Sequence, residues 1–219
     1  MYNIPIMNQL KKLKNLENLS YFDKNTLSQY IELSDNSLYS NIKRWLNNNI
    51  LIQLKKGLYV TSGYYNNLQN KESYIEFIAN KLREPAYLSL EYVLQKYSIL
   101  TESIYAYTSV TLKSRRIYTN KFGTFMYRKI KEELFTGYSI KEYAGFEIKE
   151  ATKAKALFDY LYLKDYRIPI IDKKLLNSYR LNLDEFTKKD FVEFSTYCKI
   201  TGIKKFLSLP ALISQTYDI

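Results

Sequence analysis

The chain of 219 residues contains no histidine and a single cysteine, Cys198. A Ser-His-Asp triad, a Cys-His pair and the common zinc sites all need residues that this sequence lacks, and one cysteine cannot form an internal disulfide. The phosphate-binding motif GxxxxGK and the dinucleotide motif GxGxxG are also missing, because the six glycines are scattered. We therefore expect no catalytic residues, no metal, no cofactor and no enzymatic activity.

Long apolar runs are missing as well. No run approaches the roughly 18 residues that a transmembrane helix needs. The first residues mix Asn and Lys into apolar positions, which is not the pattern of a signal-peptide core. We expect a cytoplasmic protein with no membrane partner. Hydrophobic residues make up 46% and charged residues 25%, close to the average of globular proteins, and the length allows two small domains.

Acidic residues are few relative to basic ones. The chain has 33 Lys and Arg against 22 Asp and Glu, a formal net charge of +11. The excess is spread along the sequence rather than gathered in a tail. A basic balance of this size favours a polyanionic partner, of which nucleic acid is the most common.

The first sixty residues show the pattern of a small helical domain with a hairpin. Apolar residues at spacings of three and four predict helices over about 4–19, 25–32 and 35–47. We expect Tyr30 to face inward in the second helix, and Ser34 or Asp35 to cap the third. The third helix carries the apolar stripe Leu38, Ile42, Trp45 and Leu46.

Two short strands are expected next, Leu51 to Leu54 and Leu58 to Val60, around a Lys55-Lys56-Gly57 turn. Tyr59 would anchor the returning strand on the core. Three helices followed by a hairpin with a basic tip predict a winged helix-turn-helix domain over residues 1–62.

A helical projection of the third helix places polar, non-acidic side chains opposite its apolar stripe or beside it. Such side chains supply the hydrogen-bonding groups of a major-groove recognition helix, and wing lysines can meet phosphates. An ordinary solvated helix face is the alternative, and the hairpin that follows favours double-stranded DNA as the partner. The candidate DNA-binding residues are Asn36, Ser37, Tyr39, Ser40, Lys43, Arg44, Lys55 and Lys56.

A polar stretch, residues 61–71, is expected to link this domain to a second one over residues 72–219. Its first helix should span about 72–82, and a second one, capped by Ser89, should follow Pro85. Alternating, β-branched segments between 104 and 151 predict five strands of a mixed or antiparallel sheet. A clear amphipathic helix over 151–164 and further helices should complete a mixed α/β domain, so the fold class is α+β.

The second domain contains a basic run. Between Thr111 and Lys131 there are seven Lys and Arg residues and no acidic residue, interleaved with aromatic ones, a mixture that can grip phosphates and stack bases. The alternative is a sheet with aromatic residues in the core and charges pointing outward. We expect an anion-binding patch formed by Lys113, Arg115, Arg116, Lys121, Arg128 and Lys129.

One segment resembles part of a nuclease site. Glu147-Ile148-Lys149 matches the carboxylate-x-lysine pattern of metal-dependent nucleases. Such a site needs a further acidic metal ligand, for which only Glu132, Glu133 or Glu142 lies upstream in this part of the chain. We regard a nuclease as the weakest alternative.

Four segments in order carry a family resemblance. The stretch ending LKKGLYV, then PAYLSLEYVLQKYSIL, TSVTLKSRRIYTNKFGTFMYRKI and EIKEATKAKALFDYLYL resemble the AbiEi family of abortive-infection antitoxins over nearly the whole chain. One departure is Thr152-Lys153-Ala154, where the family pattern has a proline-glutamate pair.

The resemblance implies a type IV toxin–antitoxin pair for phage defence, in which the antitoxin opposes a nucleotidyltransferase toxin without needing a stable complex. It also implies that the N-terminal domain binds inverted repeats in its own promoter and represses transcription, while the C-terminal domain supplies antitoxicity. A winged-helix transcription factor with a ligand-sensing C-terminal domain is the alternative. A neighbouring nucleotidyltransferase gene would favour the antitoxin.

Overall fold

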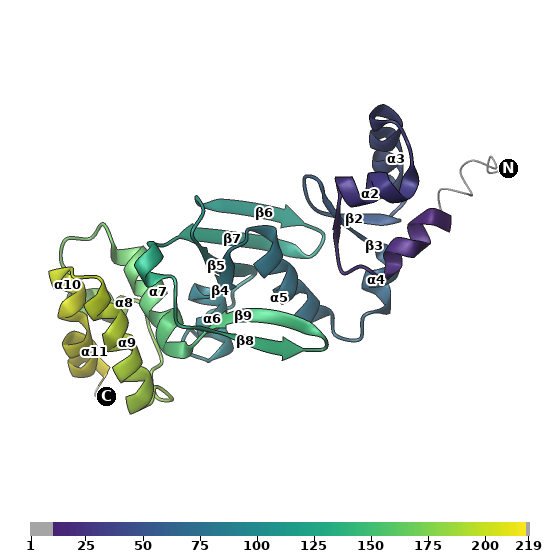
Figure 1. Ribbon diagram of the computed structural model, residues 1–219. Helices are drawn as coiled ribbons and strands as arrows, with labels where there is room; N and C mark the ends of the chain where they lie inside the picture. Colours follow the sequence, from purple (N-terminus) through teal and green to yellow (C-terminus); the bar gives the residue numbers. More distant parts are fainter. Residues whose placement is uncertain (1–10, 218–219) are drawn as a thin grey trace. The chain divides into compact units, whose positions relative to one another are not determined.

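The computed structural model describes residues 11–217, and its contacts divide the chain into two compact units (Figure 1). The first unit comprises the residues up to Glu72 together with Thr119–Phe122. The second comprises Ser73–Tyr118 and the chain from Gly123 onward. Helices and sheets occur in both units, so the expected α+β class is confirmed.

The first unit places helices around a small antiparallel sheet of strand order β1-β3-β2. The predicted first helix begins outside the described residues; residues 11–14 are helical and lead into a 3-10 turn. Residues 61–71, expected as a linker, contain a helix whose N-cap Thr61 accepts a hydrogen bond from Tyr64 N at 3.1 Å. The elements are η1 (Asn15–Asn18), β1 (Phe22–Asp23), α2 (Lys24–Ile31), α3 (Asp35–Asn47), β2 (Leu51–Lys55), β3 (Leu58–Thr61) and α4 (Ser62–Asn67).

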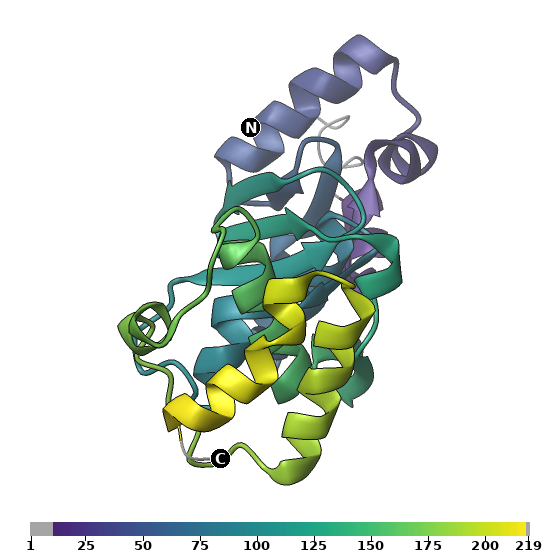
Figure 2. The same cartoon turned by 90° about the vertical axis from the view of Figure 1, so that its left-hand side faces the viewer.

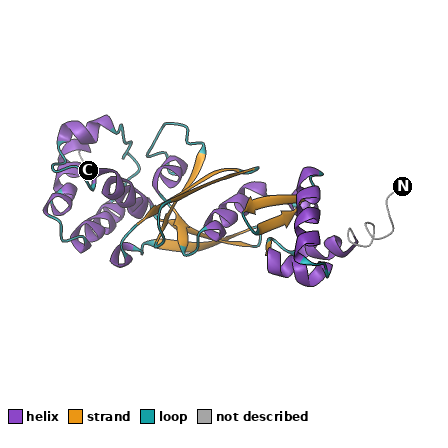
Figure 3. Ribbon diagram, turned by 90° about the horizontal axis from the view of Figure 1, so that it is seen from above, coloured by secondary structure: helices purple, strands orange, loops and turns teal. Residues whose placement is uncertain are grey.

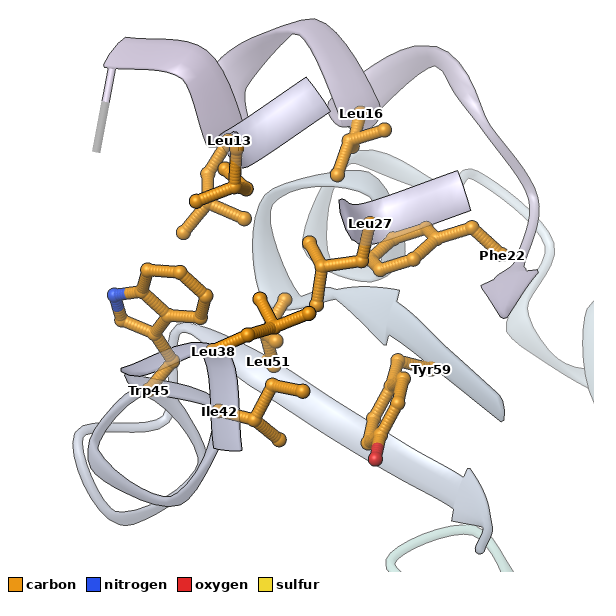
Figure 4. Close-up of a cluster of buried hydrophobic side chains, with 10 residues drawn as sticks. Leu13, Leu16, Phe22, Leu27, Leu38, Ile42, Trp45, Leu51 and Tyr59 are labelled. Carbon is orange, nitrogen blue, oxygen red and sulfur yellow. The ribbon is translucent and has the colours of Figure 1, made fainter. Parts of the chain in front are cut away.

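The core of the first unit is apolar, as its sequence pattern predicts. Leu38, Ile42 and Trp45 of α3 are buried against leucines of the preceding helices, and Tyr59 is buried among them (Figure 4). Tyr30 is the exception, because its side chain is 42% exposed instead of facing inward. A residue of that size at the end of a helix of eight residues covers little of the core, and Leu27 and Ile31 suffice for this face.

The second unit is built on a six-stranded mixed sheet of order β6-β7-β5-β4-β9-β8. All five predicted strands are present, and the sixth, β4, was not expected, because three residues are too short to show a period. The elements are α5 (Lys71–Leu82), β4 (Ala86–Leu88), α6 (Leu90–Lys96), β5 (Ala106–Thr111), β6 (Arg116–Asn120), β7 (Gly123–Lys129), η2 (Glu132–Leu134), β8 (Tyr138–Tyr143), β9 (Phe146–Ala151), α7 (Lys153–Asp165), α8 (Lys173–Ser178), α9 (Lys188–Ile200), α10 (Lys204–Leu207) and α11 (Leu209–Tyr217).

A polar side chain replaces the missing length of β4. The parallel pairing of β4 with β9 is limited to Leu88 and Glu150, so β9 has free backbone groups beyond that point. The Asn80 side chain of α5 donates to Lys149 O at 3.2 Å and accepts from Lys149 N at 2.6 Å. Helix α5 therefore lies between the strand groups β5–β7 and β8–β9 (Figure 1), which explains why Asn80 is buried.

Helix α7 is buried almost all round and is not the amphipathic helix that we expected. The C-terminal helices α8–α11 gather on one side of the second unit, and α9 packs against α7 (Figures 2 and 3). Lys155 and Asp159 of α7 are fully buried and form an ion pair at 2.6 Å. Asp159 also accepts hydrogen bonds from Tyr87 and from Ser89. Ser89 therefore supports this pair and makes no side-chain cap for α6, contrary to our expectation.

In residues 11–217 no helix combines the length and the apolar character that crossing a membrane requires.

Candidate functional site

The outer face of α3 is polar and accessible. Asn36, Ser37, Ser40 and Lys43 are all exposed, and Tyr39 is 57% exposed beside them. The buried stripe on the opposite side fixes this orientation, because Leu38, Ile42 and Trp45 are held in the core. From Asn36 to Lys71 the chain contains no acidic residue. From Asn36 onward the face therefore offers hydroxyl, amide and ammonium groups to a partner, and the exposed carboxylate of Asp35 lies at the start of the helix.

Arg44 has an additional partner that the sequence did not indicate. Its side chain is half-buried, and its guanidinium donates to the amide oxygen of Asn41 on the preceding turn. The amide nitrogen of Asn41 donates in turn to Ser37 O at 2.8 Å. This chain of bonds restricts the Arg44 side chain, so Lys43 is the more accessible of the two predicted cations.

Lys24 joins the outer face of α3 to the hairpin, a role that sequence periodicity could not reveal. Its Nζ lies 3.1 Å from Asp35 Oδ1 and 4.1 Å from the ring centre of Tyr39. The hydrogen bond from Lys24 to Asp35 raises the pKa of Lys24 above its ordinary value, and an interaction with the Tyr39 hydroxyl adds to this effect. The backbone N–H of Lys24 donates to Gly57 O at 3.2 Å, so the start of α2 contacts the hairpin turn directly.

The hairpin turn carries the predicted lysines. Strands β2 and β3 are joined by the turn at Lys56 and Gly57, where Gly57 adopts a left-handed φ of 79° that favours glycine. Lys56 is exposed, whereas Lys55 is half-buried at the end of β2. Burial raises the pKa of the Tyr59 hydroxyl, and Lys24 and Tyr39 lie near enough to affect it. The α3 face and the hairpin are thus neighbouring parts of one surface.

The six residues of the expected anion-binding patch do not all lie at the same end and on the same face of the β6–β7 pair. Lys113 and Arg115 lie in the loop before β6, and Arg116 begins that strand. Lys121 lies in the turn at the other end of β6, about 16 Å from Arg116 at the usual strand rise, and belongs to the first unit. Arg83 also reaches the loop, because its guanidinium donates to Ser114 O at 2.9 Å and to the Ser114 hydroxyl at 2.7 Å.

Arg128 and Lys129 follow each other on β7 and therefore point to opposite faces of the sheet. Arg128 lies 3.8 Å from Glu91 of α6, so an acidic residue distant in sequence partly balances the basic run. Lys129 is exposed on the other face. The aromatic residues Phe125 and Tyr127 between these charges are buried core residues.

The segment resembling a nuclease motif lies on β9. Glu147 is exposed and pairs in register with Glu142 of β8. Over the described part of the chain, no group of three or more Asp, Glu, His or Cys residues is arranged to hold a metal ion. Glu142, one of the candidate acids, therefore lies opposite Glu147, but the described residues provide no third ligand for a metal ion there.

Comparison with known proteins adds no assignment to these observations. No protein-family model matches the chain, and no curated protein is significantly similar to it.

Proposed function

We propose that the first unit is a winged helix that binds double-stranded DNA, with α3 in the major groove and the β2–β3 hairpin on the phosphate backbone. The observation that carries this proposal is the exposed polar face of α3, which has no acidic residue from Asn36 onward and has Lys43 at its centre, next to a hairpin tipped by Lys56. The order of elements supports it, because α2 and α3 directly precede the antiparallel hairpin of β2 and β3, and β1, which comes before α2, completes the three-stranded sheet. Helices read base edges in this way through polar side chains on the outer face.

On the resemblance to AbiEi antitoxins, we further propose that the chain represses its own promoter and opposes a nucleotidyltransferase toxin encoded beside it. In this scheme the first unit binds inverted repeats and the second unit supplies antitoxicity. Autoregulation and antitoxicity rest on that resemblance, whereas DNA binding rests on the residues and contacts of α3 and the hairpin.

The test of DNA binding is a gel-shift assay with the DNA upstream of the gene. Replacing Lys43 and Arg44 together by alanine should abolish specific binding, because each bidentate base contact contributes about 1 to 3 kcal/mol. Lys14→Ala is the matched control, since Lys14 is an exposed lysine of the same unit outside α3 and the hairpin. Retained specific binding by the double variant would refute the assigned face.

Antitoxicity needs a separate test, in which the chain is co-expressed with the neighbouring nucleotidyltransferase. We assign antitoxicity to the cations at the start of β6, where Arg115 of the preceding loop and Arg116, the first residue of the strand, are exposed. Replacing both by glutamate should remove protection while DNA binding persists. Lys121→Glu is the control, because Lys121 lies at the other end of β6. Full protection by the double variant would show that these charges are solvated surface only.

A ligand-responsive repressor is a second candidate function, because the second unit holds a cavity of about 560 Å³. Cavities of roughly 300 to 1,000 Å³ are usual for small-molecule sites. The two functions differ in a simple respect: a ligand of this cavity would change the affinity for promoter DNA in the sensor but not in the antitoxin.

A further inference from the structure

The cavity of about 560 Å³ lies between the end of β7, the η2 turn and the C-terminal end of α7. Its apolar wall includes Leu112, Ile130 and Leu163. Tyr162 and Tyr166 complete this wall, with their ring centres 5.3 Å apart and the planes at 67°. Ile130 and Tyr162 are buried, but the Tyr166 ring is 46% exposed at the edge of the cavity. Tyr166 therefore presents a partly exposed aromatic ring at this cavity, with the Lys205 ammonium 5.9 Å from its centre.

Charged groups of both signs line the rim. Lys129 and Lys131 are two residues apart and both line the cavity, as do Glu132 and Glu133 of η2. Lys131 and Glu133 lie 3.4 Å apart, and both side chains are about half exposed. An ion pair so exposed is weak, so an anionic ligand can replace Glu133 as the partner of Lys131.

Tyr162 adds a polar group to the otherwise apolar wall of the cavity. Burial, together with the charges of Tyr166 and Glu133, raises the pKa of the Tyr162 hydroxyl to about 12. The hydroxyl of this lining residue therefore stays protonated at neutral pH and remains a hydrogen-bond donor.

We propose that this cavity binds a ribonucleotide unit, with the base against Tyr166, the phosphate on Lys129 and Lys131, and a ribose hydroxyl donating to Glu132. A simple anion would not need the acidic residues of the rim, and a simple cation would not need its lysines. A ribonucleotide needs both, because its phosphate accepts hydrogen bonds while its ribose hydroxyls donate them, as they do to acidic residues in dinucleotide sites. Base stacking on an aromatic side chain is the usual way to hold such a ligand.

The test is isothermal titration calorimetry of the full chain with AMP, repeated with dAMP. We expect saturable one-to-one binding of AMP and about tenfold weaker binding of dAMP, because one hydrogen bond to a charged group is lost. Glu132→Gln should reduce this preference for ribose. The absence of saturable AMP binding, or equal affinity for AMP and dAMP, would overturn the proposal.

Two sets of variants localise the binding. Replacing Lys129 and Lys131 together by alanine should weaken AMP binding at least tenfold, and these exposed side chains can be removed without disturbing the core. Tyr166→Leu should weaken it similarly, after circular dichroism has shown that the variant folds. The matched control replaces Lys188 and Lys189 of α9, two exposed lysines outside the cavity, and should leave affinity unchanged. Unchanged affinity in the Lys129 and Lys131 variant would place AMP elsewhere.

The source of the ligand, a free nucleotide or one unit of an RNA strand, is distinguished by a second titration with a short single-stranded oligoadenylate. Much tighter binding of the oligonucleotide, lost in Tyr166→Leu, assigns the site to an RNA strand, whereas equal affinities assign it to the free nucleotide. Lys43→Ala serves as the independent control. It should impair DNA binding and leave AMP binding intact, so failure of either proposal can be recognised without the other.

Discussion

The two units place their charged residues differently. In the described part of the first unit, no Lys, Arg, Asp or Glu side chain is buried, and the core is a set of apolar side chains. In the second unit, Glu76, Glu150, Lys155, Asp159 and Asp165 are all buried. The first unit therefore keeps its polar groups available for a partner, while the second uses many of them for its own structure. Charge counted along the sequence therefore indicates exposed charge more directly in the first unit than in the second.

The largest expected effect breaks the polar core of the second unit. Lys155 Nζ donates to Leu134 O at 2.7 Å and to Asp159 at 2.6 Å. Burial raises the pKa of the Asp159 carboxyl, and Lys155 opposes this effect. Lys155→Met should lower the free energy of unfolding by about 3 to 5 kcal/mol, because it leaves a buried carboxylate without its ion-pair partner.

Urea unfolding followed by far-UV circular dichroism measures this loss. The double variant Lys155→Met with Asp159→Leu should regain a substantial part of it, since apolar residues can replace a buried pair. A cost below about 1 kcal/mol for Lys155→Met would contradict the view that this pair holds α7 in place.

The corresponding change in the first unit removes an apolar side chain. Leu38→Ala should cost about 2 to 5 kcal/mol, because Leu38 is fully buried and its removal leaves a cavity. Trp45 is the only tryptophan and is 1% exposed, so its fluorescence reports the unfolding of this unit alone. Ser40→Ala on the exposed face should change stability by no more than about 0.5 kcal/mol. Equal effects of the two substitutions would mean that the stripe is not the core side of α3.

The third prediction concerns the stability of the second unit, to which the buried Glu150 should make a pH-dependent contribution. Burial acts to raise the pKa of Glu150, but hydrogen bonds from Lys141 and Lys96 outweigh it and hold the pKa below its ordinary value of 4.5. A carboxyl whose pKa is lowered by folding stabilises the fold above its ordinary pKa, and this contribution is lost as pH falls through the folded pKa. The advantage of the wild type over Glu150→Gln should therefore shrink between neutral pH and about pH 3.

Urea titrations at the two pH values provide the measurement, and Glu147→Gln is the control, because Glu147 is an exposed glutamate on the same strand. The control should show little change at either pH. If the difference between wild type and Glu150→Gln is the same at both pH values, Glu150 does not titrate as described.

The smallest effect concerns the hairpin of the first unit. Lys56→Ala should lower the affinity for promoter DNA and the affinity for a scrambled duplex by the same factor, because a phosphate contact carries no sequence information. The slope of log K against log salt should fall by about 0.9 for one lost contact. Fluorescence anisotropy at several salt concentrations measures both quantities. A loss confined to promoter DNA would mean that Lys56 contacts bases.

Sequence periodicity predicted the elements well where one face of an element is polar. The buried stripe of α3, the burial of Tyr59 and five of the strands followed from it. The all-round burial of α7 could not be predicted in this way, because Asp159 is held by Tyr87 and Ser89, about 70 positions away in the chain. Strand β4 is only three residues long, too short to show a periodic pattern in the sequence. The Asn80 side chain makes the hydrogen bonds to Lys149 of β9 that a longer β4 would otherwise make.

The residues of the expected basic patch are spread more widely than the run of charges suggests, for a different reason. Counting charges in a run ignores the alternation of a strand, which sends Arg128 and Lys129 to opposite faces, and the length of β6, which separates Lys121 from Arg116. Both consequences follow from strand geometry and could have been drawn from the sequence. The partner of Arg128, Glu91, could not, because it comes from another element.

The most direct measurement of the central claim is the ratio of affinities for promoter DNA and a scrambled duplex of the same length, at physiological salt. For the wild type we expect a ratio of about 10³ or more, the usual range for a specific DNA-binding protein. Lys43→Ala should lower this ratio about tenfold or more, whereas Lys56→Ala should leave it unchanged. A wild-type ratio near one, or a ratio that Lys43→Ala does not alter, would contradict the assignment of α3 as the helix that reads DNA.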